Sequence, residues 1–154
     1  MLKLSKKADY ALIAVKHLAT QQEQRASSAH EIAQEYSISA TLMAKVLQTL
    51  ARNGLVNARH GAAGGYQLAK PPEQISALEV ISAIEGPVVI TSCVSSHGPC
   101  DATQRCSVRE PLRRLNDGIL QLLSELKISQ LTEDAPEPIL VGLHGSDAVA
   151  AGKG

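Results

Sequence analysis

Three cysteines, the only ones in the chain, follow one another closely: six residues separate Cys93 from Cys100, and five separate Cys100 from Cys106. The stretch between them contains Gly98 and Pro99 and shows no apolar periodicity, which predicts a loop. A loop can direct three thiolates at one centre. Such a ligand set suits an iron–sulfur cluster or a zinc ion, with a fourth ligand from elsewhere. Three free thiols, or one disulfide with a remaining thiol, are the alternatives.

The composition indicates where such a site would operate. The 154 residues contain no apolar run of membrane-spanning length, and residues 1–10 are too charged for a signal peptide. We therefore expect a cytoplasmic protein that does not bind membranes, in a compartment where a structural disulfide is unfavourable. Phe and Trp are absent and Tyr occurs three times. This predicts a core of packed aliphatic helices and argues against stacking on single-stranded bases.

The net charge of zero conceals an asymmetry between the two halves of the chain. Residues 1–70 contain nine Lys or Arg against four Asp or Glu, whereas residues 71–154 contain six against eleven. A basic first half joined to an acidic second half indicates that only the first half faces a polyanion such as DNA.

A helix–turn–helix is predicted between residues 28 and 53, after a first amphipathic helix over residues 5–20. Ser28 and Glu31 have the spacing of a capping box that opens a short helix. A break at residues 37–39 follows, and a longer helix begins at residue 40 and ends before Gly54. We expect its outer face to lie in a major groove and to expose Thr41, Met43, Ala44, Lys45, Gln48 and Arg52.

A hairpin is predicted directly after the helix–turn–helix. Residues 55–59 and 65–69 alternate apolar and polar side chains, as half-buried strands do, and glycine-rich residues 60–64 join them. This hairpin would form a wing whose Arg59 and His60 reach a narrow minor groove, where the potential attracts arginine. The residues predicted to contact DNA are Ser28, Ser39, Thr41, Lys45, Gln48, Arg59, His60 and Gly61.

A long helix is predicted after the cysteines. Ser107 and Glu110 have the spacing of a further capping box. The helix that follows places apolar residues in alternating steps of four and three, as in a coiled-coil seam: Val108, Leu112, Leu115, Ile119, Leu122 and Leu126. Such a seam can pack on the chain's own domain, but the length and position of this helix favour a dimer.

These elements predict a mainly α fold with a small β-wing, divided into four parts. Residues 1–87 would form a winged helix-turn-helix DNA-binding domain. Residues 88–106 would form the cluster-binding cysteine loop, and residues 107–128 the dimerisation helix. Residues 129–154, rich in Pro, Gly, Asp and Ala, would form a mostly disordered tail.

Three stretches, together with the cysteines before a long helix, carry a family resemblance. They are residues 2–12 (LKLSKKADYAL), 53–56 (NGLV) and 61–69 (GAAGGYQLA). They resemble the winged-helix regulators typified by IscR, NsrR and RirA, and the resemblance covers about residues 1–130. Residues 75–87 followed by the cysteine loop are most similar to the branch that regulates SUF iron–sulfur assembly genes.

The resemblance implies a homodimer that binds double-stranded DNA at a palindromic promoter site. It also implies that the three cysteines ligate a cluster, with 2Fe–2S favoured and 4Fe–4S as the alternative. IscR-like members have a His as fourth ligand where this chain has Arg109, which cannot ligate. NsrR-like members use an acidic residue from the first helix of the partner, at the position of Asp9, and His97 is the rival ligand. IscR-like members read bases with a Glu where this chain has Met43, so the DNA sequence preference does not transfer.

We therefore predict an iron–sulfur-sensing, homodimeric transcriptional regulator that represses iron–sulfur assembly or stress genes. One alternative is a winged-helix regulator whose cysteines bind zinc or act as a thiol-redox or nitric-oxide switch. Another is a cluster carrier without DNA binding, which would have no use for the wing. An enzyme is not expected, because no plausible pairing of a nucleophile with a base occurs outside the cysteine loop.

Overall fold

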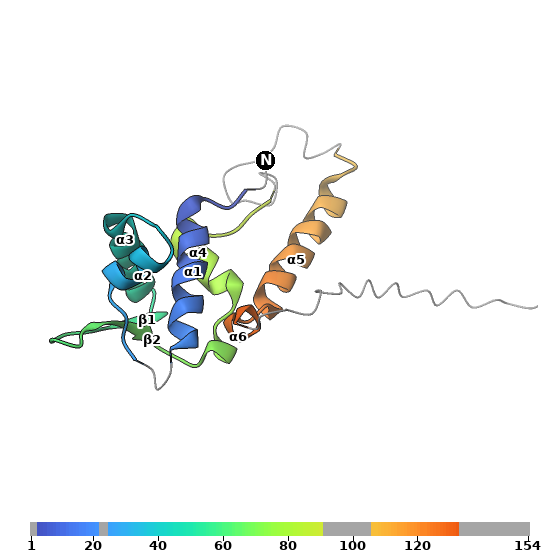
Figure 1. Cartoon of the computed structure of the whole chain (residues 1–154). Coiled ribbons are helices and arrows are strands. Elements are labelled where there is room, and N and C mark those ends of the chain that lie inside the picture. The colour runs from blue at the N-terminus through green and yellow to red at the C-terminus, as the bar shows by residue number, and fades with distance from the viewer. Residues whose placement is uncertain (1–2, 22–24, 91–105, 133–154) are drawn as a thin grey trace, which may run out of the picture.

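The computed structural model describes residues 3–21, 25–90 and 106–132, and Figure 1 shows their arrangement. The elements are α1 (Lys6–Thr20), α2 (Ala29–Glu35), α3 (Ala40–Arg52), β1 (Val56–Arg59), β2 (Gly65–Leu68), η2 (Pro72–Gln74), α4 (Ala77–Glu85), α5 (Arg109–Glu125) and α6 (Ile128–Leu131). The predicted class, mainly α with a small two-stranded wing, is confirmed. None of the helices described is long and apolar enough to cross a membrane.

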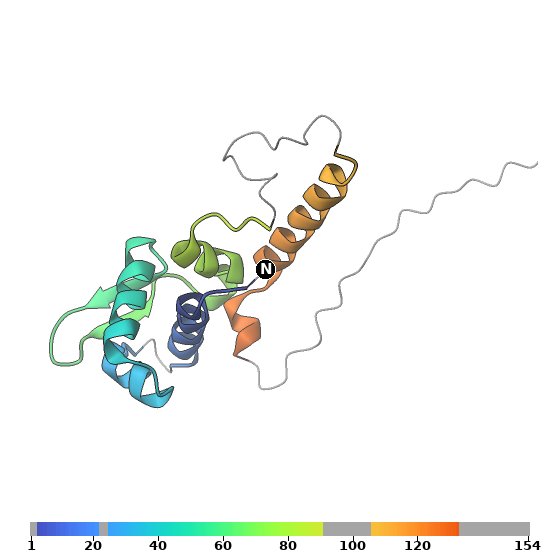
Figure 2. The same cartoon turned by 90° about the horizontal axis from the view of Figure 1, so that it is seen from above.

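Helix α1 lies at the centre of the molecule. Figure 1 and Figure 2 agree in placing α2, α3 and the wing on one side of α1, and α5 on the other. Ser5 caps its start, because the Ala8 backbone N–H donates to Ser5 Oγ at 3.3 Å. The buried face of α1 is rich in alanine and consists of Ala8, Ala11, Ala14, Val15 and Leu18. Because alanine side chains are small, the backbones of neighbouring elements can approach this face closely.

The core is aliphatic, as the composition predicted. Burying an aliphatic side chain stabilises the fold by roughly 1.5–3 kcal/mol, and here α1, α2, α3, α4 and α6 all contribute such side chains. The largest fully buried ones are Ile32, Met43, Leu47, Leu50, Ile75, Ile81 and Ile128.

Local capping signals set the starts of α2 and α4. Ser28 and Glu31 exchange side-chain and backbone hydrogen bonds in a complete capping box, and Ser76 and Glu79 do the same. Gly54 follows α3 with a φ of +72°, a conformation that favours glycine and that ends the helix as predicted.

Helix α5 begins later than the predicted capping box would place it. The Ser107 box does not form, because Val108 is the N-cap residue and its side chain makes no cap hydrogen bond. Glu110 instead pairs with Arg113 and Arg114, at 2.8 and 3.2 Å. The stronger attraction of two guanidinium groups for the carboxylate explains why it does not turn back toward the helix start.

After α5 the chain returns to the first domain. The Ala77 backbone N–H donates to the Leu126 carbonyl at 2.8 Å, and the Ile128 N–H donates to the Ile75 carbonyl at 2.9 Å. Ile128 is fully buried in the core of the DNA-binding unit. Helix α6 (Ile128–Leu131) thus spans the boundary predicted after residue 128. Most of the predicted tail, residues 133–154, lies outside the described residues.

Candidate nucleic-acid interface and cysteine site

Helix α3, the second helix of the helix–turn–helix, presents three predicted DNA-contacting side chains to solvent. Thr41, Lys45 and Gln48 are exposed, and their spacing of four and three residues places them on one face. Met43 was expected on this outer face, but it is fully buried, and that prediction is wrong. The core residues of α3 follow it at three, four and seven positions, so Met43 belongs to the inner stripe.

Ser28 and Ser39 precede α2 and α3. The Ser28 backbone N–H donates to the Glu31 carboxylate at 2.6 Å, and the Glu31 N–H donates to Ser28 Oγ at 3.1 Å. These hydrogen bonds, the one from the Ser28 backbone first, hold the pKa of Glu31 below its usual value. Ser28 is therefore a structural cap. Ser39 is exposed and its side chain makes no cap hydrogen bond, which leaves its hydroxyl free to donate to a phosphate.

The wing is the predicted hairpin, and its two strands are antiparallel. Val56 pairs with Leu68 at its base, and Arg59 pairs with Gly65 near its tip. Arg59, His60 and Gly61 are all exposed there. An arginine and a histidine at the exposed end of a hairpin can extend toward a nucleic-acid backbone or groove.

The wing is held against the connector that precedes α2. The Ser27 N–H donates to the Tyr66 carbonyl at 3.0 Å, and the Tyr66 N–H donates to the Ser27 carbonyl at 2.8 Å. Gly65 makes this approach possible. Its φ is +147°, and a Cβ at this position would lie 2.6 Å from the Ser27 carbonyl carbon and oxygen. The wing position thus depends on glycine at residue 65.

Sequence patterns assigned no role to His17, a buried residue of α1. Its Nε2 lies 3.2 Å from Ser27 Oγ and 3.1 Å from Gln21 Nε2, and its Nδ1 lies 3.4 Å from the Glu35 carboxylate. The Tyr36 ring meets it edge to face, with centroids 5.8 Å apart. Its place on the buried stripe of α1 was the signal available in the sequence.

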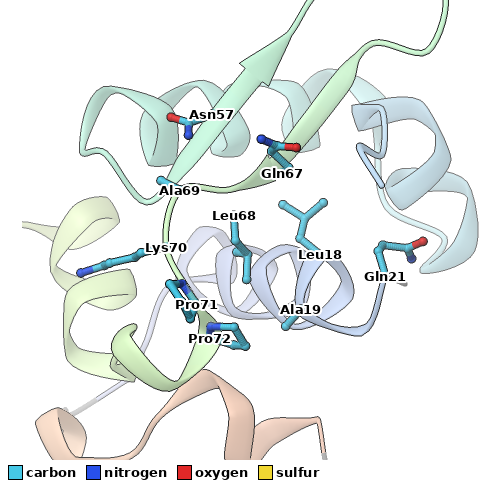
Figure 3. A pocket seen from close by; sticks show the side chains of 10 residues that line it. All are labelled: Leu18, Ala19, Gln21, Asn57, Gln67, Leu68, Ala69, Lys70, Pro71 and Pro72. Carbon is cyan, nitrogen blue, oxygen red and sulfur yellow. The ribbon is translucent and has the colours of Figure 1, made fainter. Parts of the chain in front are cut away.

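A small pocket lies at the base of the wing, between the sheet and the end of α1 (Figure 3). Its volume is about 220 Å³, and Asn57, Gln67 and Gln21 bring amide groups to its lining. Gln67 Oε1 is buried and has no hydrogen-bond partner within the described parts of the chain. The volume is below the roughly 300–1,000 Å³ of most ligand sites. An ordered water that satisfies Gln67 fits this pocket better than an organic ligand.

The structure describes two of the predicted cluster ligands. Cys106 is a half-buried free thiol that precedes α5, and Asp9 is an exposed carboxylate in the first turn of α1. Cys93, Cys100 and the rival ligand His97 lie outside the described residues. Within residues 3–21, 25–90 and 106–132, no three His, Cys, Asp or Glu side chains are grouped to hold a metal ion. Those ranges contain one of the three cysteines.

Two residues of the predicted dimer seam, at the start and in the middle of α5, lie on an open surface. Val108 and Leu115 are 54% and 53% exposed, which is high for large apolar side chains. Asn116 is the one buried residue of this helix, and its Oδ1 accepts a hydrogen bond from the Ile90 backbone N–H at 3.1 Å. This hydrogen bond therefore holds Ile90, which lies just before the cysteine segment, against the middle of α5.

The first turns of α5 carry a network of exposed charges. The Glu110 carboxylate accepts hydrogen bonds from Arg113 at 2.8 and 3.0 Å and from Arg114 at 3.2 Å. These bonds lower the pKa of Glu110 to about 2. Arg113 also contacts Asp117 at 2.8 Å. The network keeps the Glu110 carboxylate ionised and supports the helical start of α5. Exposed ion pairs such as these stabilise a fold only modestly.

An apolar groove of about 500 Å³ separates the start of α1 from α5. Leu4 lines one side, Ile81 of α4 forms part of the floor, and Ile119 and Leu123 of α5 line the other side. A second chain that covered α5 would therefore come close to the first turn of α1.

The chain is similar to characterised regulators along nearly its whole length. The HTH-type transcriptional regulator IscR of Photorhabdus laumondii is 28% identical over 153 residues, which is 99% of this chain and 93% of that protein. CymR, the global cysteine regulator of B. subtilis, has a TM-score of 0.71 and 29% identity, over 86% of this chain and 97% of that chain. T. potens IscR has a TM-score of 0.65 at 24% identity, over 84% and 85% of the two chains, and supports the shared fold.

The family model Rrf2, described as an iron-dependent transcriptional regulator, matches residues 4–134. This match spans the helix–turn–helix, the wing, all three cysteines and α5. The structure and the relatives agree on a DNA-binding regulator with a winged helix, and the chain belongs to the Rrf2 family of transcriptional regulators.

Proposed function

We propose that this regulator is a cytoplasmic homodimer that senses its iron–sulfur cluster and represses iron–sulfur assembly or stress genes. The observation that carries the proposal is the placement of two kinds of surface around α1. The exposed polar face of α3 and the wing lie on one side, and α5, which Cys106 precedes, lies on the other (Figure 1, Figure 2). DNA recognition and sensing would thus use separate faces joined by one central helix.

On the DNA side, α3 would enter a major groove and the wing would follow the adjacent minor groove. Lys45 and Arg59 are exposed, and both belong to the half of the chain that carries a net charge of +5. A lysine on the recognition helix suits a phosphate, whereas an arginine at a wing tip suits a narrow minor groove. Thr41 and Gln48 can donate hydrogen bonds to base edges or phosphates.

On the sensing side, the chemistry of the donor set fits an iron–sulfur cluster. Cys93, Cys100 and Cys106 offer three thiolates from one short segment, and Cys106 is a free thiol in the structure. Asp9 would supply the fourth ligand, from the partner subunit, because a chain that covers α5 also approaches the first turn of α1 along the apolar groove. When bound, the cluster supplies a centre that responds to oxidants, to small molecules and to iron supply.

Helix α1 links the proposed ligand Asp9, whose side chain is exposed, to the DNA-reading helix α3. Asp9 lies on α1, and the buried face of α1 packs against α3 in the same core. Residues of α3 in that core, such as Val46 and Leu50, are on the face opposite Lys45. A displacement of α1 therefore moves the outer face of α3, which gives a physical route from the sensor to DNA.

The experiment that tests sensing is anaerobic purification, followed by absorption and Mössbauer spectra and iron and sulfide analysis. Replacing Cys93, Cys100 or Cys106 with Ala should remove the visible chromophore. Asp9→Ala should retain the cluster with an altered spectrum, and His97→Ala should leave the spectrum unchanged. Full iron and sulfide content in the triple cysteine variant would refute the proposal. The opposite behaviour of Asp9→Ala and His97→Ala would transfer the fourth ligand to His97.

A second candidate function is a thiol-based switch without a cluster. The similarity to CymR, described as a global cysteine regulator, supports it at 29% identity. Under this alternative, the purified protein would be colourless and free of sulfide, and a mild oxidant would change its DNA affinity through Cys106 or its neighbours in sequence. Zinc in the metal analysis would point to a structural zinc site instead.

The experiment that tests DNA binding compares three single alanine variants at several salt concentrations. Lys45→Ala should weaken binding uniformly across sequences and reduce the salt slope by about one. Arg59→Ala should cost roughly 1–3 kcal/mol, mostly at A·T-rich steps. Arg114→Ala, an exposed arginine on α5 across the molecule, is the matched control and should have no effect. Parent-like binding by both Lys45→Ala and Arg59→Ala would contradict the proposed interface.

A further inference from the structure

The side chain of His17 joins three parts of the DNA-binding unit from a buried position. His17 is 5% exposed and belongs to α1. Its Nε2 contacts Ser27, in the connector that pairs with the wing, and Gln21, just beyond α1. Its Nδ1 faces Glu35 at the end of α2, at 3.4 Å. The helix–turn–helix, the wing and the central helix therefore meet at one imidazole ring.

The hydrogen-bond partners determine which ring nitrogen carries the proton. The Gln21 side-chain nitrogen can only donate, so His17 Nε2 accepts and is unprotonated. The Ser27 hydroxyl can donate to the same nitrogen at 3.2 Å. The Glu35 carboxylate lies 3.4 Å from Nδ1 and can only accept, which favours the proton on Nδ1. The arrangement holds a neutral ring, and a second proton on Nε2 would point at the Gln21 donor.

Ser27 extends this contact to the wing. It exchanges two backbone hydrogen bonds with Tyr66 of β2, and its carbonyl lies against Gly65. Loss of the His17 contact would remove the side-chain hydrogen bond of Ser27. The connector and the base of the wing that pairs with it could then move away from α1. Loss of the Glu35 contact would free the end of α2, just before the turn that leads to the recognition helix α3.

We infer that His17 is a positioning residue for DNA binding: its neutral ring sets the wing and α2 against α1, and a proton on Nε2 ends its acceptance of the Gln21 and Ser27 hydrogen bonds and so loosens the wing. The inference rests on the DNA-binding part of the function proposed above, and not on the iron–sulfur cluster. Under this inference, a proton-sensitive contact forms part of the DNA-reading unit. The side chain that makes this contact does not itself reach the exposed face of α3.

The charged groups around the ring act in opposite directions. Glu35 faces Nδ1 directly, and Glu31 lies four residues earlier on the same helix. Both carboxylates attract an imidazolium. Arg25, which pairs with Glu31 at 3.6 Å, opposes them, and the Tyr36 ring contacts the imidazole edge to face.

The first test needs no DNA. Long-range proton–nitrogen NMR correlation spectra of the purified full chain report the tautomer of each histidine. At about pH 8 the His17 ring should show a protonated Nδ1 and an unprotonated Nε2, and any second proton taken up in acid should appear on Nε2. Simultaneous shifts of the Ser27 and Tyr66 amides are expected. A ring with the proton on Nε2 at about pH 8, or amides that do not respond, would overturn the inference.

The second test measures DNA affinity from about pH 8 to about pH 5.5. The background protein for this test carries the substitutions His30→Gln and His60→Gln. These two exposed histidines would strengthen phosphate binding in acid and so hide a loss of DNA affinity caused by His17. In this background, affinity should fall on the order of five- to tenfold in acid, within the usual range of coupling between sites. Adding His17→Gln, which can still accept from Ser27, should reduce that fall to less than about twofold.

Glu35→Gln is the second variant, since it changes an exposed side chain and keeps the ring. Removal of the carboxylate that attracts the imidazolium should move the loss of affinity to lower pH. An equal loss in the background and in His17→Gln, or an unchanged pH profile in Glu35→Gln, would show that His17 is only a packing residue. A protein that binds no DNA at any pH would refute the proposed function and leave the NMR result standing.

Discussion

Replacing Gly65 with Ala should separate the wing from the connector before α2. A residue with a Cβ at a φ of +147° carries backbone strain of about 1–3 kcal/mol. The new Cβ would lie 2.6 Å from the carbonyl carbon and oxygen of Ser27, and backbone atoms cannot rotate away as a side chain can. The two backbone hydrogen bonds between Ser27 and Tyr66 would be lost, at about 0.5–1.5 kcal/mol each. The free energy of unfolding should therefore fall by roughly 2–6 kcal/mol.

The assay is equilibrium unfolding in urea, with DNA binding measured on the same preparations. Gly118→Ala is the matched control, because a Cβ at Gly118 meets nothing within 4 Å and the residue lies inside α5. This change should raise stability by up to about 1 kcal/mol through helix propensity. A Gly65→Ala variant as stable as the parent would refute the reasoning. So would a destabilised variant that still binds DNA with full affinity, since the wing position would then not matter.

Three further predictions concern α5. Leu115→Glu should convert a dimer into a monomer in sedimentation experiments, because an unpaired charge in a desolvated interface costs several kcal/mol; a variant that remains dimeric would place the interface elsewhere. Asn116→Leu should leave the Ile90 N–H without its acceptor, cost about 1–3 kcal/mol and speed hydrogen exchange at Ile90. The pKa of Glu110 is lowered from 4.5 to about 2, so its contribution to stability is present above pH 4.5 and is lost as the pH falls toward 2. Circular dichroism should show that acid loss for the parent, and Glu110→Gln should lack it.

The parts of the fold that short-range signals specify could be predicted from the sequence. The capping boxes at Ser28 and Ser76 and the glycine at residue 54 each act within one turn of chain, so their residue types and spacing suffice. The wing has a similar local origin, because alternating strands flank a glycine-rich turn. The exposure of Lys45 and Arg59 followed from the same patterns.

The remaining features depend on contacts between distant parts of the chain. Met43 is apolar and unbranched, and whether it faces the core depends on how α3 is rotated against α1. Ile128 joins a core whose other buried residues lie at least 48 positions earlier, such as Val80, which no local pattern reveals. Glu110 had two competing partners, the helix start and the arginines, and the arginines prevailed. The sites of Cys93 and Cys100 lie outside the described residues, and their role stays a prediction.

The return of residues 126–131 to the first domain has a consequence for the order of folding during synthesis. Chains emerge from the ribosome N-terminus first, yet the core around Ile75 lacks Ile128 until that late residue has been made. The DNA-binding unit can therefore close only after the whole cysteine segment has been translated. A chain that stops after Lys127 would keep every DNA-contacting residue but leave an isoleucine-sized hole in the core, at about 2–5 kcal/mol. Such a truncation would be an unstable DNA-binding protein rather than one that merely lacks its tail.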